Sequence, residues 1–142
     1  MIIMAVDFGD ARTGLAVCDR AEMLASPAGV ISERRFEVCV EKAAAAAKEK
    51  GAEMIVVGHP LNMNGTAGER AEKCEMFAEA LKAASGLPVA LWDERSTTVT
   101  AHQYLNDTNT CGKKRKAVVD AVAATIILEG YLNFRRIKGD PS

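Results

Sequence analysis

Short apolar runs, rich in β-branched residues and bounded by turn-forming residues, predict five strands in this chain. The predicted strands cover residues 2–6, 13–18, 28–31, 54–57 and 89–92. The four residues 9–12 between the first two runs are typical of a hairpin connection. The chain therefore begins with strands that lie next to one another.

Longer segments with apolar residues at helical spacing predict the helices. The first covers residues 36–50 and ends at Gly51, and the second has its apolar stripe at Ala71, Cys74, Ala78 and Leu81 and ends at Gly86. Ser96 or Thr97 can cap a third helix that reaches about residue 105. Residues 106–114 read as a polar loop, and residues 117–134 as a strongly apolar final helix.

The order of these elements predicts an α/β fold. An initial antiparallel meander argues against a plain doubly wound sheet, and later strands separated by helices require parallel crossovers. A mixed five-stranded sheet with helices on both faces fits best. With no repeat or linker, residues 1–142 are expected to form one domain.

The composition, 49% hydrophobic and 26% charged, is that of a soluble globular protein. No apolar run approaches the roughly 20 residues of a membrane span, and the opening segment lacks a basic region before Asp7. A cytoplasmic protein with no membrane partner is expected. Cys18, Cys39, Cys74 and Cys111 form no C-x-x-C pair, so reduced thiols are expected rather than a zinc site or disulfides.

The charge is unevenly distributed along the chain, although the formal net charge is only -1. Between residues 113 and 138 seven basic residues stand against two acidic ones, an excess of five. The basic residues are Lys113, Lys114, Arg115, Lys116, Arg135, Arg136 and Lys138. This asymmetry permits a polyanionic ligand, but a solvated helix face would have the same pattern.

Acidic residues follow two of the predicted strands. Asp7 ends the first strand and shares its parity with Ile3 and Ala5, and the carboxyl ends of strands are where open α/β sheets bind ligands. Asp93 and Glu94 end the last strand. Only one of the two can readily share a face with Asp7, and strand parity in the sequence does not decide which.

Asp120 is the only ionisable residue in the apolar segment 118–128. Burying an unpaired carboxylate costs several kcal/mol, so Asp120 requires a cation, either Lys116 one turn earlier or a metal ion. Three carboxylates from the first strand, a late strand and the last helix suit Mg²⁺ or Mn²⁺. Two such ions can activate water and stabilise the leaving oxygen in phosphodiester hydrolysis, so a nuclease is expected.

Several segments in this order closely resemble the YqgF/RuvX family. They are AVDFG at 5–9 with RTGLA at 12–16, VVGHPLNMNG at 56–65, DERSTT at 93–98 and KAVVDAVAA at 116–124. The resemblance implies an RNase H-like fold related to the resolvase RuvC. It also implies a nuclease that acts at the 5′ end of precursor 16S rRNA, whereas the older family label of Holliday junction resolvase implies a branched DNA substrate.

Carried over by motif, the resemblance implies roles for individual residues. Asp7, Glu94 and Asp120 correspond to the metal-binding, catalytic set. Arg12, Arg95, Thr97 and Thr98 correspond to supporting residues of the site, and Lys113, Lys114 and Lys116 stand where they could bind phosphates. The chain departs from the family at His59, usually apolar, and at Asn64, usually Asp. We interpret His59 as a packed or solvent-facing histidine rather than a general base.

Two other classes of protein remain open from the sequence. Asp7-Phe8-Gly9 followed by Thr13-Gly14 is similar to the phosphate loop of actin-like ATPases, but the chain has only one such loop and one domain. A non-catalytic RNA-binding factor of ribosome assembly or transcription would keep the fold. The sequence does not decide whether the substrate is RNA or DNA, or whether the protein acts as an endonuclease or an exonuclease. It also does not decide whether the protein is a monomer or a homodimer.

Overall fold

The computed structural model describes residues 1–60, 68–93 and 112–138, with side chains except those of residues 112–121 and 137–138. The helix predicted after Ser96 or Thr97 lies outside these residues, as do Asn64 and Cys111. The five described strands are β1 (Ile3–Asp7), β2 (Arg12–Cys18), β3 (Ala25–Ser32), β4 (Met54–His59) and β5 (Val89–Asp93). The three described helices are α1 (Phe36–Lys50), α2 (Glu69–Ser85) and α4 (Gly112–Lys138).

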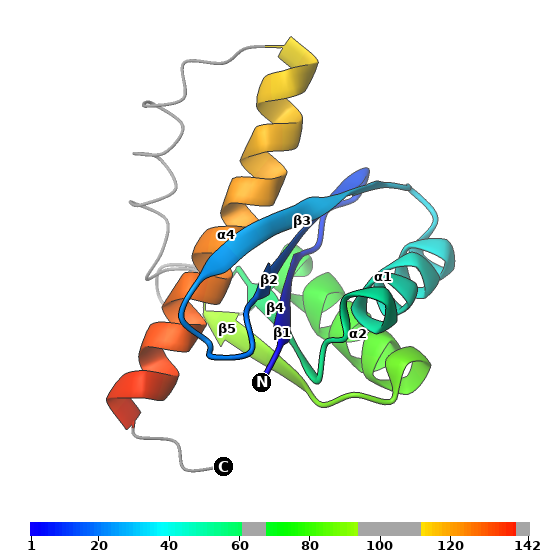
Figure 1. Ribbon diagram of the computed structural model, residues 1–142. Coiled ribbons are helices and arrows are strands. Elements are labelled where there is room, and N and C mark those ends of the chain that lie inside the picture. Colours follow the sequence, from blue (N-terminus) through cyan, green and yellow to red (C-terminus); the bar gives the residue numbers. More distant parts are fainter. Residues whose placement is uncertain (61–67, 94–111, 139–142) are drawn as a thin grey trace.

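The strands form one sheet in the order β3-β2-β1-β4-β5. The β1–β2 and β2–β3 pairs are antiparallel, whereas β1–β4 and β4–β5 are parallel. In Figure 1 the helices α1 and α2 lie together on one side of the sheet, and the long helix α4 crosses the other side. The predicted mixed five-stranded sheet with helices on both faces is confirmed.

Three predicted boundaries were wrong by three residues or more. Strand β3 begins at Ala25 rather than at residue 28 and includes Pro27, which an edge strand tolerates because one row of its N–H groups has no ladder partner. Helix α4 begins at Gly112, so residues 112–114 are helix and not loop. It continues to Lys138 instead of ending at Phe134, because lysine and arginine have high helix propensity and their polarity does not by itself end a helix.

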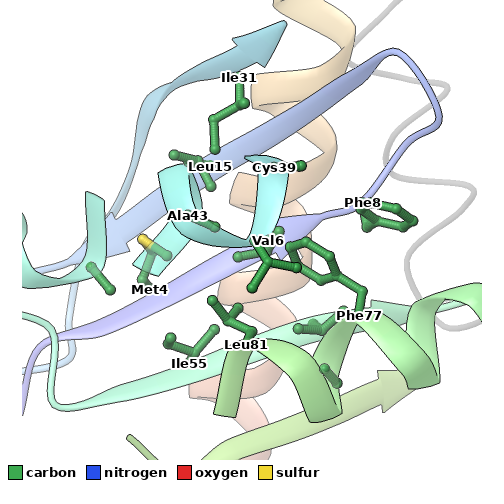
Figure 2. Packing of buried hydrophobic residues seen from close by; sticks show 14 of the residues in the cluster. Met4, Val6, Phe8, Leu15, Ile31, Cys39, Ala43, Ile55, Phe77 and Leu81 are labelled. Atoms are coloured by element: carbon green, nitrogen blue, oxygen red, sulfur yellow. The ribbon is translucent and has the colours of Figure 1, made fainter. Parts of the chain in front are cut away.

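The alternation of side chains along the strands builds two separate cores. On the face covered by α1 and α2, Met4 and Val6 of β1 pack with Phe77 and Leu81 of α2 (Figure 2). On the face covered by α4, strand residues of the opposite parity pack against that helix. The strand residues include Ile3, Ala5 and Val56, and the helix residues include Ala124, Ile127 and Leu128. We call the two sides of the sheet the α1/α2 face and the α4 face. Successive residues of β1 alternate between these two faces.

Glycine is required at position 9, where the chain turns from β1 to β2. A Cβ on Gly9 would lie 2.2 Å from the carbonyl oxygen of Arg12, a contact that only a backbone shift could relieve. We therefore expect Gly9→Ala to lower the free energy of unfolding by about 1–3 kcal/mol, measured by urea titration. Asp10→Ala, at an exposed neighbour in the same loop, should change it by about 0.5 kcal/mol or less. Equal losses in the two variants would contradict this account of Gly9.

Two further properties of the described residues complete the fold. The side chains of Cys18, Cys39 and Cys74 are buried. Within the part of the chain that the structure describes, no helix has the length and apolar character needed to cross a membrane.

Candidate functional site

Asp7 is the last residue of β1, at the carboxyl end of a strand in the middle of the sheet. Its parity with Ile3 and Ala5, which pack against α4, directs it to the α4 face. Asp7 is half-buried, whereas the residues before it in β1 are buried. The structure thus places this carboxylate at the predicted end of the strand and on the same side as Ile3 and Ala5, and it shows that α4 covers this side.

Glycines stand on both sides of Asp7 in the neighbouring strands. Gly14 of β2 is its direct antiparallel partner, and Gly58 of β4 lies one step beyond the Val6–Val57 pair. Both glycines are buried. Because glycine has no side chain beyond its α-carbon, neither adjacent strand places a side chain directly beside Asp7.

Arg12 opens β2 at the same edge of the sheet. It has the parity of Gly14 and of Ala16, which packs on the α4 face, so Arg12 and Asp7 share one face. Arg12 is half-buried. Of the residues predicted for the site, Asp7 and Arg12 are the two whose side chains the structure describes, and it brings them to the same face and edge.

The register of β5 shows to which face of the sheet Asp93 is directed, and so whether Asp93 can share a face with Asp7. Trp92 pairs with Gly58 and belongs to the core on the α4 face. The next residue, Asp93, pairs with His59 and has the opposite parity, so it is directed to the α1/α2 face. Asp93 therefore does not share a face with Asp7.

The other predicted site residues are not described in full. Glu94, Arg95, Thr97 and Thr98 lie outside the described residues. Lys113, Lys114, Lys116 and Asp120 belong to α4 as far as the backbone is described, with Asp120 one turn before Ala124. Among the described side chains no group of three or more His, Cys, Asp or Glu could hold a metal ion, and two of the three predicted ligands, Glu94 and Asp120, are not among them.

The loop that follows Asp7 is held from the α1/α2 face by contacts that the sequence did not predict. Arg70 of α2 donates a hydrogen bond from Nη2 to the carbonyl oxygen of Phe8 over 3.1 Å. The buried Thr13 hydroxyl accepts one from the Gly9 N–H over 3.4 Å and lies 3.3 Å from the Cys39 Sγ. These contacts fix the backbone directly after the carboxylate.

His59 lies at the end of β4, and its Nε2 is 2.9 Å from Oε2 of Glu75 on α2. Only 16% of the His59 side chain is exposed. Its parity with Ile55 and Val57 places it on the α1/α2 face, away from Asp7. The structure agrees with a packed histidine and gives it no position from which to act as a base beside Asp7.

A mixed sheet in this order, with a carboxylate ending its first strand and a C-terminal helix across that face, defines an RNase H-like protein. Two solved structures share the fold. The Thermus thermophilus RuvC in complex with a Holliday junction has a TM-score of 0.54 at 16% identity, with 94% of this chain and 96% of that chain covered. The fowlpox virus Holliday junction resolvase has a TM-score of 0.57 at 13% identity, with 94% and 99% covered.

The sequence relatives give the family. Residues 1–134 match RuvX, described as Holliday junction resolvase. A protein of Desulfitobacterium hafniense named "Putative pre-16S rRNA nuclease" is 44% identical over 138 residues, covering 97% of this chain and 96% of the relative. One of Halothermothrix orenii with the same name is 42% identical over 135 residues, covering 95% and 96%. This chain belongs to the RuvX family, a family of nucleases, and the predicted family and enzyme class are confirmed.

Proposed function

We propose that this protein is a divalent-metal-dependent nuclease that processes the 5′ end of precursor 16S rRNA. The observation that carries the proposal is Asp7, a half-buried carboxylate at the carboxyl end of β1 with glycine on both neighbouring strands. The relatives with about the same length carry the name of a pre-16S rRNA nuclease, which supports the choice of substrate.

The proposed metal ligands are Asp7, Glu94 and Asp120, and the ion is Mg²⁺ or Mn²⁺. Carboxylate oxygens are the donors these ions prefer. The opposite parity of Asp93 favours Glu94 as the ligand from the end of β5. Helical spacing supports Asp120, because it stands one turn before Ala124, a residue that packs on the sheet. When bound, the metal supplies an activated water and stabilises the leaving oxygen.

The remaining proposed residues bind and orient the substrate. Arg12 shares the face and edge of Asp7, so its guanidinium is suited to a phosphate next to the scissile one. Arg95, Thr97 and Thr98 are proposed to support the same phosphate through charge and hydroxyl groups. Cytoplasmic location, and a monomer or homodimer without a membrane partner, remain predictions.

A second candidate is resolution of Holliday junctions in DNA. The description of the RuvX family favours it, and it differs from the first in requiring two cuts placed symmetrically on a branched substrate. A third candidate, a non-catalytic RNA-binding assembly or transcription-associated factor, would need the carboxylates only for structure.

The decisive experiment is cleavage of a labelled panel by the purified protein with Mg²⁺, Mn²⁺ or EDTA. The panel holds a precursor 16S rRNA 5′ fragment, an unrelated single-stranded RNA of equal length and a four-way DNA junction. We expect metal-dependent cutting of the rRNA fragment and none in EDTA. Preferential cutting of the junction would instead favour the resolvase, and RNA binding without cutting would favour the assembly factor.

The lysines at the start of α4 are proposed to bind phosphates without reading sequence. Lys113→Ala combined with Lys114→Ala should weaken RNA binding about equally for all sequences. The slope of log affinity against log salt should also become shallower, by about 0.7 for each phosphate of a single strand that is no longer neutralised. Lys48→Ala with Lys50→Ala, in the last turn of α1, is the matched control of equal charge. An unchanged slope in the α4 variant would contradict the assignment.

A further inference from the structure

A hollow of about 320 Å³ lies on the α1/α2 face, beside the loop that follows Asp7. Four segments form it: the β1–β2 loop, the connection between β3 and α1, the start of α1 and the first half of α2. Its apolar lining comes from Phe8, Phe36 and Met76, and its polar rim includes Asp10, Arg34 and Lys73. We call it the aromatic hollow; Asp7 and Arg12, the two proposed site residues whose side chains the structure describes, do not line it.

The aromatic walls of the hollow are fixed by the core beneath them. Phe8 stacks on Phe77 with ring centroids 4.4 Å apart, and Phe36 meets Phe8 edge-on at 6.0 Å. Figure 2 shows Phe8 beyond the end of β1, next to Phe77 from α2. The hollow is thus already formed without a ligand, and a planar ring entering it would meet rigid apolar walls.

Met76 is a conspicuous part of the rim. It is 63% exposed, unlike the neighbouring Phe77, which is fully buried. A large apolar side chain in water gains free energy when a ligand covers it. Its position at the mouth of a hollow with aromatic walls indicates a ligand with an apolar, flat surface.

The charges at the rim suit a ligand that carries phosphate. Nζ of Lys73 lies 3.6 Å from Oδ1 of Asp10 and 3.9 Å from Oε1 of Glu69, so this lysine is shared between two carboxylates. Glu33 is held by Arg35 at 3.1 Å and Lys42 at 3.3 Å. The Arg35 hydrogen bonds lower the pKa of Glu33 to about 2, so its charge is neutralised by partners rather than by protonation. Arg34 is exposed at the same rim and adds positive charge.

We propose that the aromatic hollow binds one nucleobase of the substrate strand, next to the nucleotide whose phosphate lies at Asp7. The volume is at the lower end of the range of ligand pockets, which suits a single base. Phe8 follows Asp7 directly, and consecutive Cα atoms are about 3.8 Å apart, so the two sites share one loop as a wall. The inference rests on the proposed function, since it assumes a nucleic acid at Asp7.

The test measures binding, not cleavage, and uses the full-length Asp7→Asn protein. The probe is the precursor 16S rRNA 5′ fragment, made with one abasic nucleotide at each position in turn around the cut. Loss of the base that occupies the hollow should weaken binding about tenfold at one position, because a stacked base contributes that order of affinity. Abasic sites elsewhere should have little effect.

Met76→Glu tests whether the hollow is the place where that base binds. The substitution puts a negative charge at the mouth of the hollow, so we expect the variant to bind the intact RNA about tenfold more weakly. The abasic nucleotide that weakens binding to the parent protein should cause no additional loss of affinity in this variant. Met23→Glu is the matched control, because Met23 is 64% exposed on the turn between β2 and β3. It should bind intact RNA as the parent does and keep the abasic penalty.

The outcomes separate the two proposals. A flat abasic scan, or a penalty that persists in Met76→Glu, overturns the base-binding hollow whatever the cleavage result. Failure of Asp7→Asn to abolish cleavage overturns the proposed catalytic site, while the abasic scan still decides the hollow. Base binding in the hollow is supported if Met76→Glu weakens binding of the intact RNA and also removes the penalty at the sensitive abasic position.

Discussion

Replacing Asp7 by asparagine is expected to reduce the rate of RNA cleavage about a thousandfold or more and to leave the affinity for RNA close to that of the wild type. Asparagine keeps the shape of the side chain but removes the negative charge that a divalent ion requires. Loss of metal-assisted activation of water removes several kcal/mol of transition-state stabilisation, and each 1.36 kcal/mol is about tenfold in rate. Single-turnover cleavage of the precursor rRNA fragment measures the effect.

Asp93→Asn is the matched control for this prediction. The substitution makes the same chemical change at the end of another parallel strand of the sheet, on the opposite face. We expect Asp93→Asn to retain most of the activity, and Glu94→Gln to lose as much as Asp7→Asn. Titration of Mn²⁺ onto each variant gives a second measurement, independent of cleavage. If Asp93→Asn were inactive and Glu94→Gln active, the ligand from β5 would have been assigned to the wrong residue.

The face and edge of Asp7 were predictable because they depend only on local properties. Side chains alternate along any strand, so Asp7 shares a side with Ile3 and Ala5, and the acidic residue that ends the apolar run 2–6 must lie at the carboxyl end of the strand. The helix ends at Gly51 and Gly86 were predictable for the same reason, since both adopt the left-handed conformation with φ of 72°.

The surroundings of Asp7 could not be predicted because they depend on pairing between distant segments. Gly14 and Gly58 flank it only in the register that β1 adopts with β2 and β4. The parity of Asp93 relative to Asp7 likewise becomes defined only when Trp92 packs on the α4 face. The polarity of the segment also misled at the start of α4, where residues 112–114 were interpreted as a loop although lysine has high helix propensity.

The site also depends on the core behind it, and Phe77 connects the two. Its side chain is fully buried, and its ring contacts Phe8 at 4.4 Å and Phe36 at 6.2 Å. Phe8 follows Asp7 directly, and Arg70 of the same helix bonds the Phe8 carbonyl. One helix therefore holds both the core and the loop that positions the carboxylate.

Phe77→Ala is accordingly expected to lower the free energy of unfolding by about 3–5 kcal/mol, through reduced apolar burial and the cavity left between Phe8 and Phe36. For a chain of this size that corresponds to a fall in Tm of about 10–17 °C. Phe134→Ala is the matched control, because Phe134 is also aromatic and helical but 41% exposed, and it should lose markedly less. Urea unfolding of both variants measures the difference.

Equal losses would mean that the aromatic cluster around Phe77 is not the main support of the β1–β2 loop. With the expected loss, the residual activity of folded Phe77→Ala should fall as well, since the backbone after Asp7 would no longer be held in place.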